Sequence, residues 1–111
     1  MNNTVLKTNR NQYFIKFGIN AHCEAEELLG FPITQITEER AGMLTFRTLL
    51  SVGLKYAGNP VPLEKAGEIM EEVVSDRGIE YFSKQIGEAI EKSLNQQNSQ
   101  NFKQNHNKKK N

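Results

Sequence analysis

The sequence predicts an α+β fold that is mainly α: a small N-terminal β-hairpin packed on a bundle of about four helices, followed by a disordered tail. Two β-favouring runs flank an Asn-rich turn near the N-terminus. Apolar residues then recur at helical spacing, and the last residues are almost all Asn, Gln and Lys. With 111 residues, one domain is expected, at residues 3–94, with the tail at 95–111.

The predicted hairpin pairs residues 5–8 with residues 12–17 across the turn Asn9-Arg10-Asn11. Both runs are rich in β-branched and aromatic residues, and Asn tolerates the left-handed conformations that tight turns need. Alternation along the second run places Tyr13, Ile15 and Phe17 on one face. Because a lone hairpin is marginally stable, we expect that face to pack on helices.

Helical periodicity predicts a first helix over residues 20–29 and a second over residues 37–57. In the second, Thr37 is the expected N-cap. A third helix begins at Pro62, whose missing N–H costs little in a first turn, and it ends at the break before Gly78. A fourth occupies residues 79–94, where the polar tail begins.

The second predicted helix is apolar almost all the way round, which is typical of a buried helix. It carries more apolar side chains than one packing face requires, so part of this set is expected to reach the surface. Exposed apolar patches mark protein partners, and Met adapts to irregular surfaces. The candidate partner-binding residues are Met43, Leu44, Phe46, Leu50 and Met70. The alternative is that all of them belong to the core.

No pattern in the sequence predicts catalysis, a cofactor or a metal site. Cys23 is the single cysteine and adjoins His22, a spacing unlike the paired ligands of zinc sites. Neighbouring helical residues also point in different directions, which disfavours a Cys–His catalytic pair. The paired glutamates fall on polar helix positions. The glycine-rich phosphate-binding motifs G-x-G-x-x-G and G-x-x-x-x-G-K-[ST] do not occur in the sequence. We therefore expect a protein that is not an enzyme and binds no cofactor.

Charge is unevenly distributed along the chain. Residues 95–111 carry four lysines and no acid, whereas residues 1–94 carry a net charge of −3. A mildly acidic domain is a poor nucleic-acid surface, but the lysine tail leaves a nucleic-acid-binding regulator as the alternative function. The single cysteine indicates a reducing cytoplasm. We expect neither a signal peptide nor a membrane span, because no sufficiently long apolar run occurs.

Two short segments carry a family resemblance: Tyr13-Phe14-Ile15-Lys16-Phe17-Gly18 at the end of the hairpin, and Glu26-Glu27-Leu28-Leu29-Gly30-Phe31-Pro32-Ile33 at the end of the first helix. A hydrophobic helix follows, then a Pro-containing turn with Leu63-Glu64-Lys65-Ala66-Gly67, and a final pair of helices. Across residues 4–94 this order resembles the tail assembly chaperones of long-tailed bacteriophages. The matching positions are structural, so no functional residue is carried over from the family.

The resemblance implies a chaperone that binds the tape-measure protein in the host cytoplasm and keeps it soluble during tail assembly. Such a chaperone leaves before the virion is complete, so it is not expected in the mature particle. A longer form made by translational frameshifting would be the one to contact the tail-tube protein, and Lys108-Lys109-Lys110 is compatible with a slippery adenine run. The oligomeric state stays open, with a homo-oligomer as one alternative.

Overall fold

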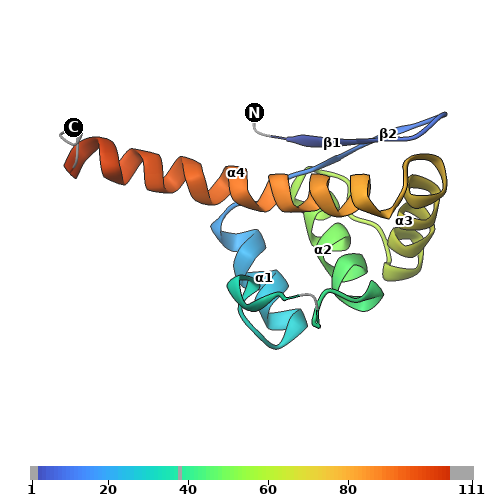
Figure 1. The fold of residues 1–111 in the computed structure, drawn as a ribbon, viewed down its shortest axis with the longest axis horizontal. Coiled ribbons are helices and arrows are strands. Elements are labelled where there is room, and N and C mark those ends of the chain that lie inside the picture. Colours follow the sequence, from blue (N-terminus) through green and yellow to red (C-terminus); the bar gives the residue numbers. More distant parts are fainter. Residues whose placement is uncertain (1–2, 38, 106–111) are drawn as a thin grey trace.

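The computed structural model describes residues 3–37 and 39–105, with the backbone alone described from residue 95 onward. A two-stranded antiparallel hairpin precedes four α-helices and one short 3-10 helix. Figure 1 shows the hairpin lying along α4, and α2 packs against both the hairpin and α4. The predicted fold class, an N-terminal hairpin packed on about four helices, is confirmed.

The hairpin consists of β1 (Thr4–Lys7) and β2 (Gln12–Ile15). Thr4 lies opposite Ile15 and Lys7 lies opposite Gln12. The amide of Thr8 donates to the carbonyl of Asn11 across the turn, over 2.9 Å. The second strand ends at Ile15 rather than at Phe17, although Phe17 still packs into the core as the alternation predicted.

Glycine and proline set most of the helix boundaries. Gly30 and Gly78 follow the ends of α1 and α3 with positive φ angles of 85° and 98°, which glycine adopts without steric cost. Pro62 immediately precedes α3. The helices are α1 (Ile19–Leu29), the 3-10 helix η1 (Ile33–Gln35), α2 (Met43–Tyr56), α3 (Leu63–Arg77) and α4 (Ile79–Asn105).

The second helix begins at Met43, so the prediction that Thr37 caps it is wrong. The Thr37 carbonyl instead accepts from the Arg40 amide in a turn, over 2.9 Å. Gly42 then adopts an extended conformation at the N-cap of α2. Glycine has a low helix propensity, so it does not favour an extension of α2 toward Thr37. The Thr45 hydroxyl donates to the Arg40 carbonyl over 2.6 Å, which fixes this turn against the first turn of α2.

The core forms where the second half of α2 meets the inner face of the hairpin. Leu50, Leu54, Leu6 and Ile15 are completely buried there. Gly53 lets the two elements approach closely: a Cβ at this position would lie 2.9 Å from the Cβ of Ile15. The Gly53 carbonyl also accepts from the amide of Lys16, over 3.1 Å. The absence of a side chain at Gly53 therefore sets the distance between helix and sheet.

Side chains of α4 cover the outer edge of β1. The amide of Lys7 donates to the Tyr81 hydroxyl over 3.0 Å, and the Gln85 amide group donates to the carbonyl of Val5 over 2.9 Å. Because residues 5 and 7 present their backbone groups away from β2, these bonds satisfy the groups that an edge strand leaves free. The fourth helix thus protects the sheet edge as well as packing on it.

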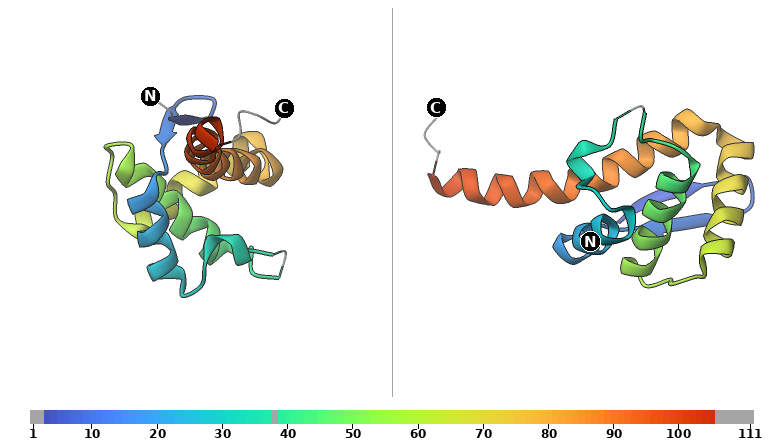
Figure 2. Two further views of the ribbon diagram at one scale, coloured as in Figure 1. Left: turned by 90° about the vertical axis from the view of Figure 1, so that its left-hand side faces the viewer. Right: turned by 90° about the horizontal axis from the view of Figure 1, so that it is seen from below.

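The fourth helix continues past Leu94 to Asn105. It thus extends into residues 95–105, which the sequence predicted to belong to a disordered tail. Figures 1 and 2 show its C-terminal part projecting beyond the other elements. No Gly or Pro interrupts residues 95–105, so neither of the two strongest helix-breaking residues stops the helix at residue 94. Residues 106–111, including Lys108, Lys109 and Lys110, lie outside the described residues.

Candidate functional site

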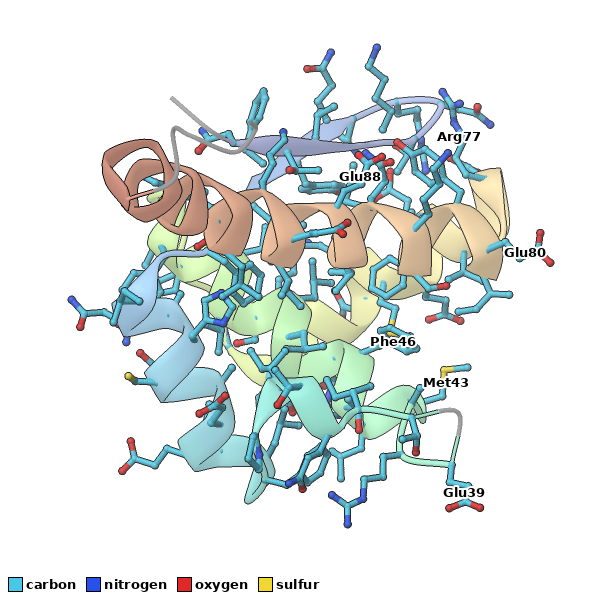
Figure 3. All side chains as sticks on the ribbon, turned by 60° about the vertical axis from the view of Figure 1, so that its left-hand side comes forward. Glu39, Met43, Phe46, Arg77, Glu80 and Glu88 are labelled. Carbon is cyan, nitrogen blue, oxygen red and sulfur yellow. The ribbon has the colours of Figure 1, made fainter. Side chains whose placement is uncertain are left out.

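The first turn of α2 presents large apolar side chains to solvent. Met43 is 66% exposed and Leu44 is 67% exposed, the highest values among the large hydrophobic side chains of the described part. Figure 3 shows Met43 at the start of α2, pointing away from the body of the molecule. Met43 and Leu44 are neighbours in the chain, and apolar side chains that gather on a surface are typical of a binding site.

A groove of about 450 Å³ runs between α2 and α3 next to these residues. Its walls are mostly aliphatic, and its polar members are Arg47 and Glu71. On α3 the lining positions repeat at helical spacing, so they form one continuous face. The lining residues are Met43, Leu44, Arg47, Gly67, Met70, Glu71 and Val74.

A second hollow of about 440 Å³ lies on the other side of Leu44. It is bounded by the end of α1, the start of α3 and the polar stripe of α2. Its lining residues are Leu28, Leu29, Phe31, Leu44, Thr45, Thr48, Ser51 and Leu63. Leu28 is 61% exposed and Leu63 is 47% exposed. Because Leu44 borders both hollows, they form one surface, which we call the apolar face.

Arg47 is the cation of the apolar face. Its aliphatic stem lies against α3, where a Cβ on Gly67 would be 3.4 Å from its Cδ atom. Its Nε atom is buried and has no hydrogen-bond partner among the described residues. Glu71 borders the same groove, yet no ion pair joins it to Arg47. This buried Nε is out of reach of a ligand, but the terminal amino groups of the guanidinium are not among the buried atoms and can donate to an acceptor in the groove.

The five predicted partner-binding residues divide into three groups. Met43 and Leu44 are exposed on the apolar face, and Met70 forms part of its floor with 6% of its surface exposed. Phe46 is half-buried and packs edge-to-face on Phe82, with 5.8 Å between ring centroids. Leu50 is fully buried, so its prediction as a surface residue is wrong. It lies in the half of α2 that the hairpin covers.

Sequence reasoning missed Arg47, Leu28 and Leu63 as parts of this face. Arg47 did leave a signal, because it is the one charged residue among the first turns of an otherwise apolar helix. Leu28 and Leu63 left none: each sits on an ordinary amphipathic stripe. Their exposure depends on how the ends of α1 and α3 meet α2, which periodicity does not specify.

A separate polar cluster joins the hairpin turn to α3 through Glu72. Thr8 and Tyr13 donate to this carboxylate over 2.6 Å each, and Asn11 donates over 2.8 Å. These hydrogen bonds lower the pKa of Glu72 to about 2. Burial and the bond to Glu72 raise the pKa of Tyr13 to about 12. The polar groups of this cluster form hydrogen bonds with one another, so the cluster holds the hairpin turn against α3 rather than forming an open site.

A smaller polar cluster joins α1 to α2. Lys55 and Tyr56 donate to Glu24 over 3.0 Å and 2.9 Å, which lowers the pKa of Glu24 and raises the pKa values of both partners. Nearby, burial lowers the pKa of His22, while Cys23 is exposed. Across the described residues, no three potential ligands gather in a metal-binding arrangement. Within the same residues, no helix has the length and apolar character needed to cross a membrane.

Comparisons of the chain with protein-family models, with curated proteins and with solved structures find no match. Function is therefore inferred from the geometry of the apolar face and from the family resemblance of residues 4–94.

Proposed function

We propose that this protein is a tail assembly chaperone, which binds the tape-measure protein of a long-tailed bacteriophage and keeps it soluble while the tail tube polymerises. The observation that carries the proposal is the apolar face, with Met43 and Leu44 about two-thirds exposed at its centre. A tape-measure protein is a long helical client whose apolar stripes are unpaired before assembly, so it is the kind of molecule that such a face would shield.

The shape of the face supports a helical client. Grooves between helices accept the apolar side of an amphipathic helix, whose anchors recur at i, i+3, i+4 and i+7. Here two hollows flank Leu44, so one client helix would place successive anchors on its two sides. Each contact of this size is weak by itself. A client with many such segments gains from multivalency when several copies bind along its length.

Co-expression with the tape-measure protein of the same genome tests this proposal. The measurement is the fraction of that client in the soluble lysate, with and without this chain. We expect the wild-type chain to raise the soluble fraction and the double variant Met43→Ser/Leu44→Ser to lose most of the effect, because the variant removes the exposed centre of the face.

Phe14→Ser provides the matched control. Phe14 is also a large exposed hydrophobic residue, at 46%, but it lies on β2 and outside the apolar face. This variant is expected to keep the client as soluble as the wild type does. A client that is equally soluble with and without the chain would rule out the chaperone proposal. Equal losses in both variants would place the binding surface elsewhere or attribute binding to general hydrophobicity.

A further inference from the structure

The charged groups of the groove differ in how well solvent can screen them. Arg47 is half-buried: its Nε atom is buried without an acceptor among the described residues, whereas its terminal amino groups are not among the buried atoms. Glu68 and Glu71 stand exposed along the outer side of α3. Exposed charges are screened by water and salt, whereas an enclosed one acts strongly over a short distance. The half-buried cation is therefore screened less than the exposed glutamates, and the groove favours a negatively charged group beside Arg47.

Within the described part of the chain, Glu71, which lines the groove, and Glu68, which lies outside it, both leave Arg47 without an ion pair. Glu68 instead lies 3.8 Å from the Nζ of Lys65. Glu71 borders both the apolar groove and the polar hollow on the far side of α3. The stem of Arg47 lies against Gly67, which places the guanidinium beside the groove. A guanidinium in an apolar groove suits a carboxylate, which it binds with directed hydrogen bonds.

We propose that the apolar face selects an amphipathic helix that carries an acidic side chain between its apolar anchors, with that carboxylate bound by Arg47. This inference rests on the proposed function and adds the chemistry of the client segment. The anchors on either side of the acid occupy the two hollows that flank Leu44. A segment with an amide or an apolar group at the central position carries no negative charge to pair with the guanidinium, so it binds more weakly.

An array of overlapping synthetic peptides from the tape-measure protein of the same genome provides the probe. The dissociation constant of the tightest-binding peptide is measured by fluorescence anisotropy, and each Asp or Glu in it is then replaced by Asn or Gln. We expect one such replacement to weaken binding to the wild-type chain by about tenfold, which is the lower end for close charge pairs at interfaces.

The same peptide pair is measured against Arg47→Met and Arg77→Met. Met keeps the length and apolar character of the arginine stem while removing its charge. Arg77→Met is the matched control, since Arg77 stacks over Tyr81 at 5.5 Å, away from the groove. Arg47→Met is expected to bind both peptides alike, whereas Arg77→Met keeps the tenfold preference.

Equal binding of the acidic and amide peptides by the wild-type chain would overturn the Arg47 inference alone and leave the chaperone proposal standing. A preference that persists in Arg47→Met would overturn it as well, because another group would then recognise the carboxylate. If no peptide of the array binds, and the chain does not raise the solubility of the client, both the inference and the chaperone proposal are overturned.

Discussion

The two halves of α2 have opposite surroundings. The C-terminal half is covered by the hairpin, with Leu50 and Leu54 completely buried and Gly53 in close contact with β2. The N-terminal half carries Met43 and Leu44 in the open beside a groove that contains an unpaired guanidinium atom. One helix thus combines a part that stabilises the fold with a part that the fold leaves available. We therefore expect substitutions in the C-terminal half of α2 to change mainly stability and substitutions in its N-terminal half to change mainly binding.

The largest difference in the free energy of unfolding is expected between substitutions of two leucines of this helix. Leu50→Ala empties space in the core and is expected to lower the free energy of unfolding by about 2–5 kcal/mol. Leu44→Ala removes an exposed side chain and is expected to change it by no more than about 0.5 kcal/mol. Urea denaturation followed by circular dichroism measures both. Similar losses in the two variants would mean that the N-terminal half of α2 is also covered in solution.

Substitutions of two glycines, Gly53 and Gly67, are expected to show the same contrast with smaller changes in stability. Gly53→Ala places a Cβ 2.9 Å from the Cβ of Ile15, which cannot move without its backbone. We expect this overpacking to outweigh the gain in helix propensity and to cost about 1–3 kcal/mol in thermal or urea unfolding.

Gly67→Ala is the matched control for Gly53→Ala. Its Cβ meets the flexible stem of Arg47 at 3.4 Å. Replacing a glycine within a helix by alanine is expected to stabilise this variant by about 0.5–1 kcal/mol. A loss of stability in Gly67→Ala would show that the α2–α3 groove is as tightly packed as the hairpin side, which would contradict its role as an open site.

The smallest effect is expected at the hairpin turn, where the contribution of Glu72 to stability depends on pH in the acid range. Its folded pKa of about 2 lies below the ordinary value of 4.5. The stabilisation is therefore present above pH 4.5 and is lost as the pH falls from 4.5 towards 2. Unfolding midpoints measured across this range should fall in the wild type and fall less in Glu72→Gln.

Glu71→Gln is the control for this pH dependence, because Glu71 neighbours Glu72 and accepts no hydrogen bond from the turn in the described structure. Its unfolding profile is expected to follow that of the wild type. At the alkaline end, the Tyr13 pKa of about 12 exceeds its ordinary value of 10.0, so its contribution is lost as the pH rises from 10 towards 12. Identical acid profiles for all three proteins would exclude Glu72 as the link between turn and helix.

The sequence was sufficient where the signal is local. The hairpin turn around Asn9 to Asn11 and the breaks at Gly30, Pro62 and Gly78 could be predicted because each depends on the conformational preferences of a few adjacent residues. The start of α2 was predicted too early, because Thr37 and its following glutamates have the composition of a helix start, whereas the helix begins only after Gly42, which is extended and has a low helix propensity. The candidate binding residues were predicted only in part for a different reason. Apolar character identifies Leu44 and Leu50 equally, and nothing local says which one the hairpin covers.

By itself, the sequence determined the element types, the apolar excess of α2 and the absence of recognisable catalytic motifs, because composition and periodicity encode them directly. Only the tertiary structure decided that Leu50 is inside and Leu44 outside, and that Arg47 lies in a groove beside Gly67. Exposure is a property of the contacts between segments distant in the chain. Those contacts form through the combined packing of the hairpin, α2 and α3, and no single segment specifies them.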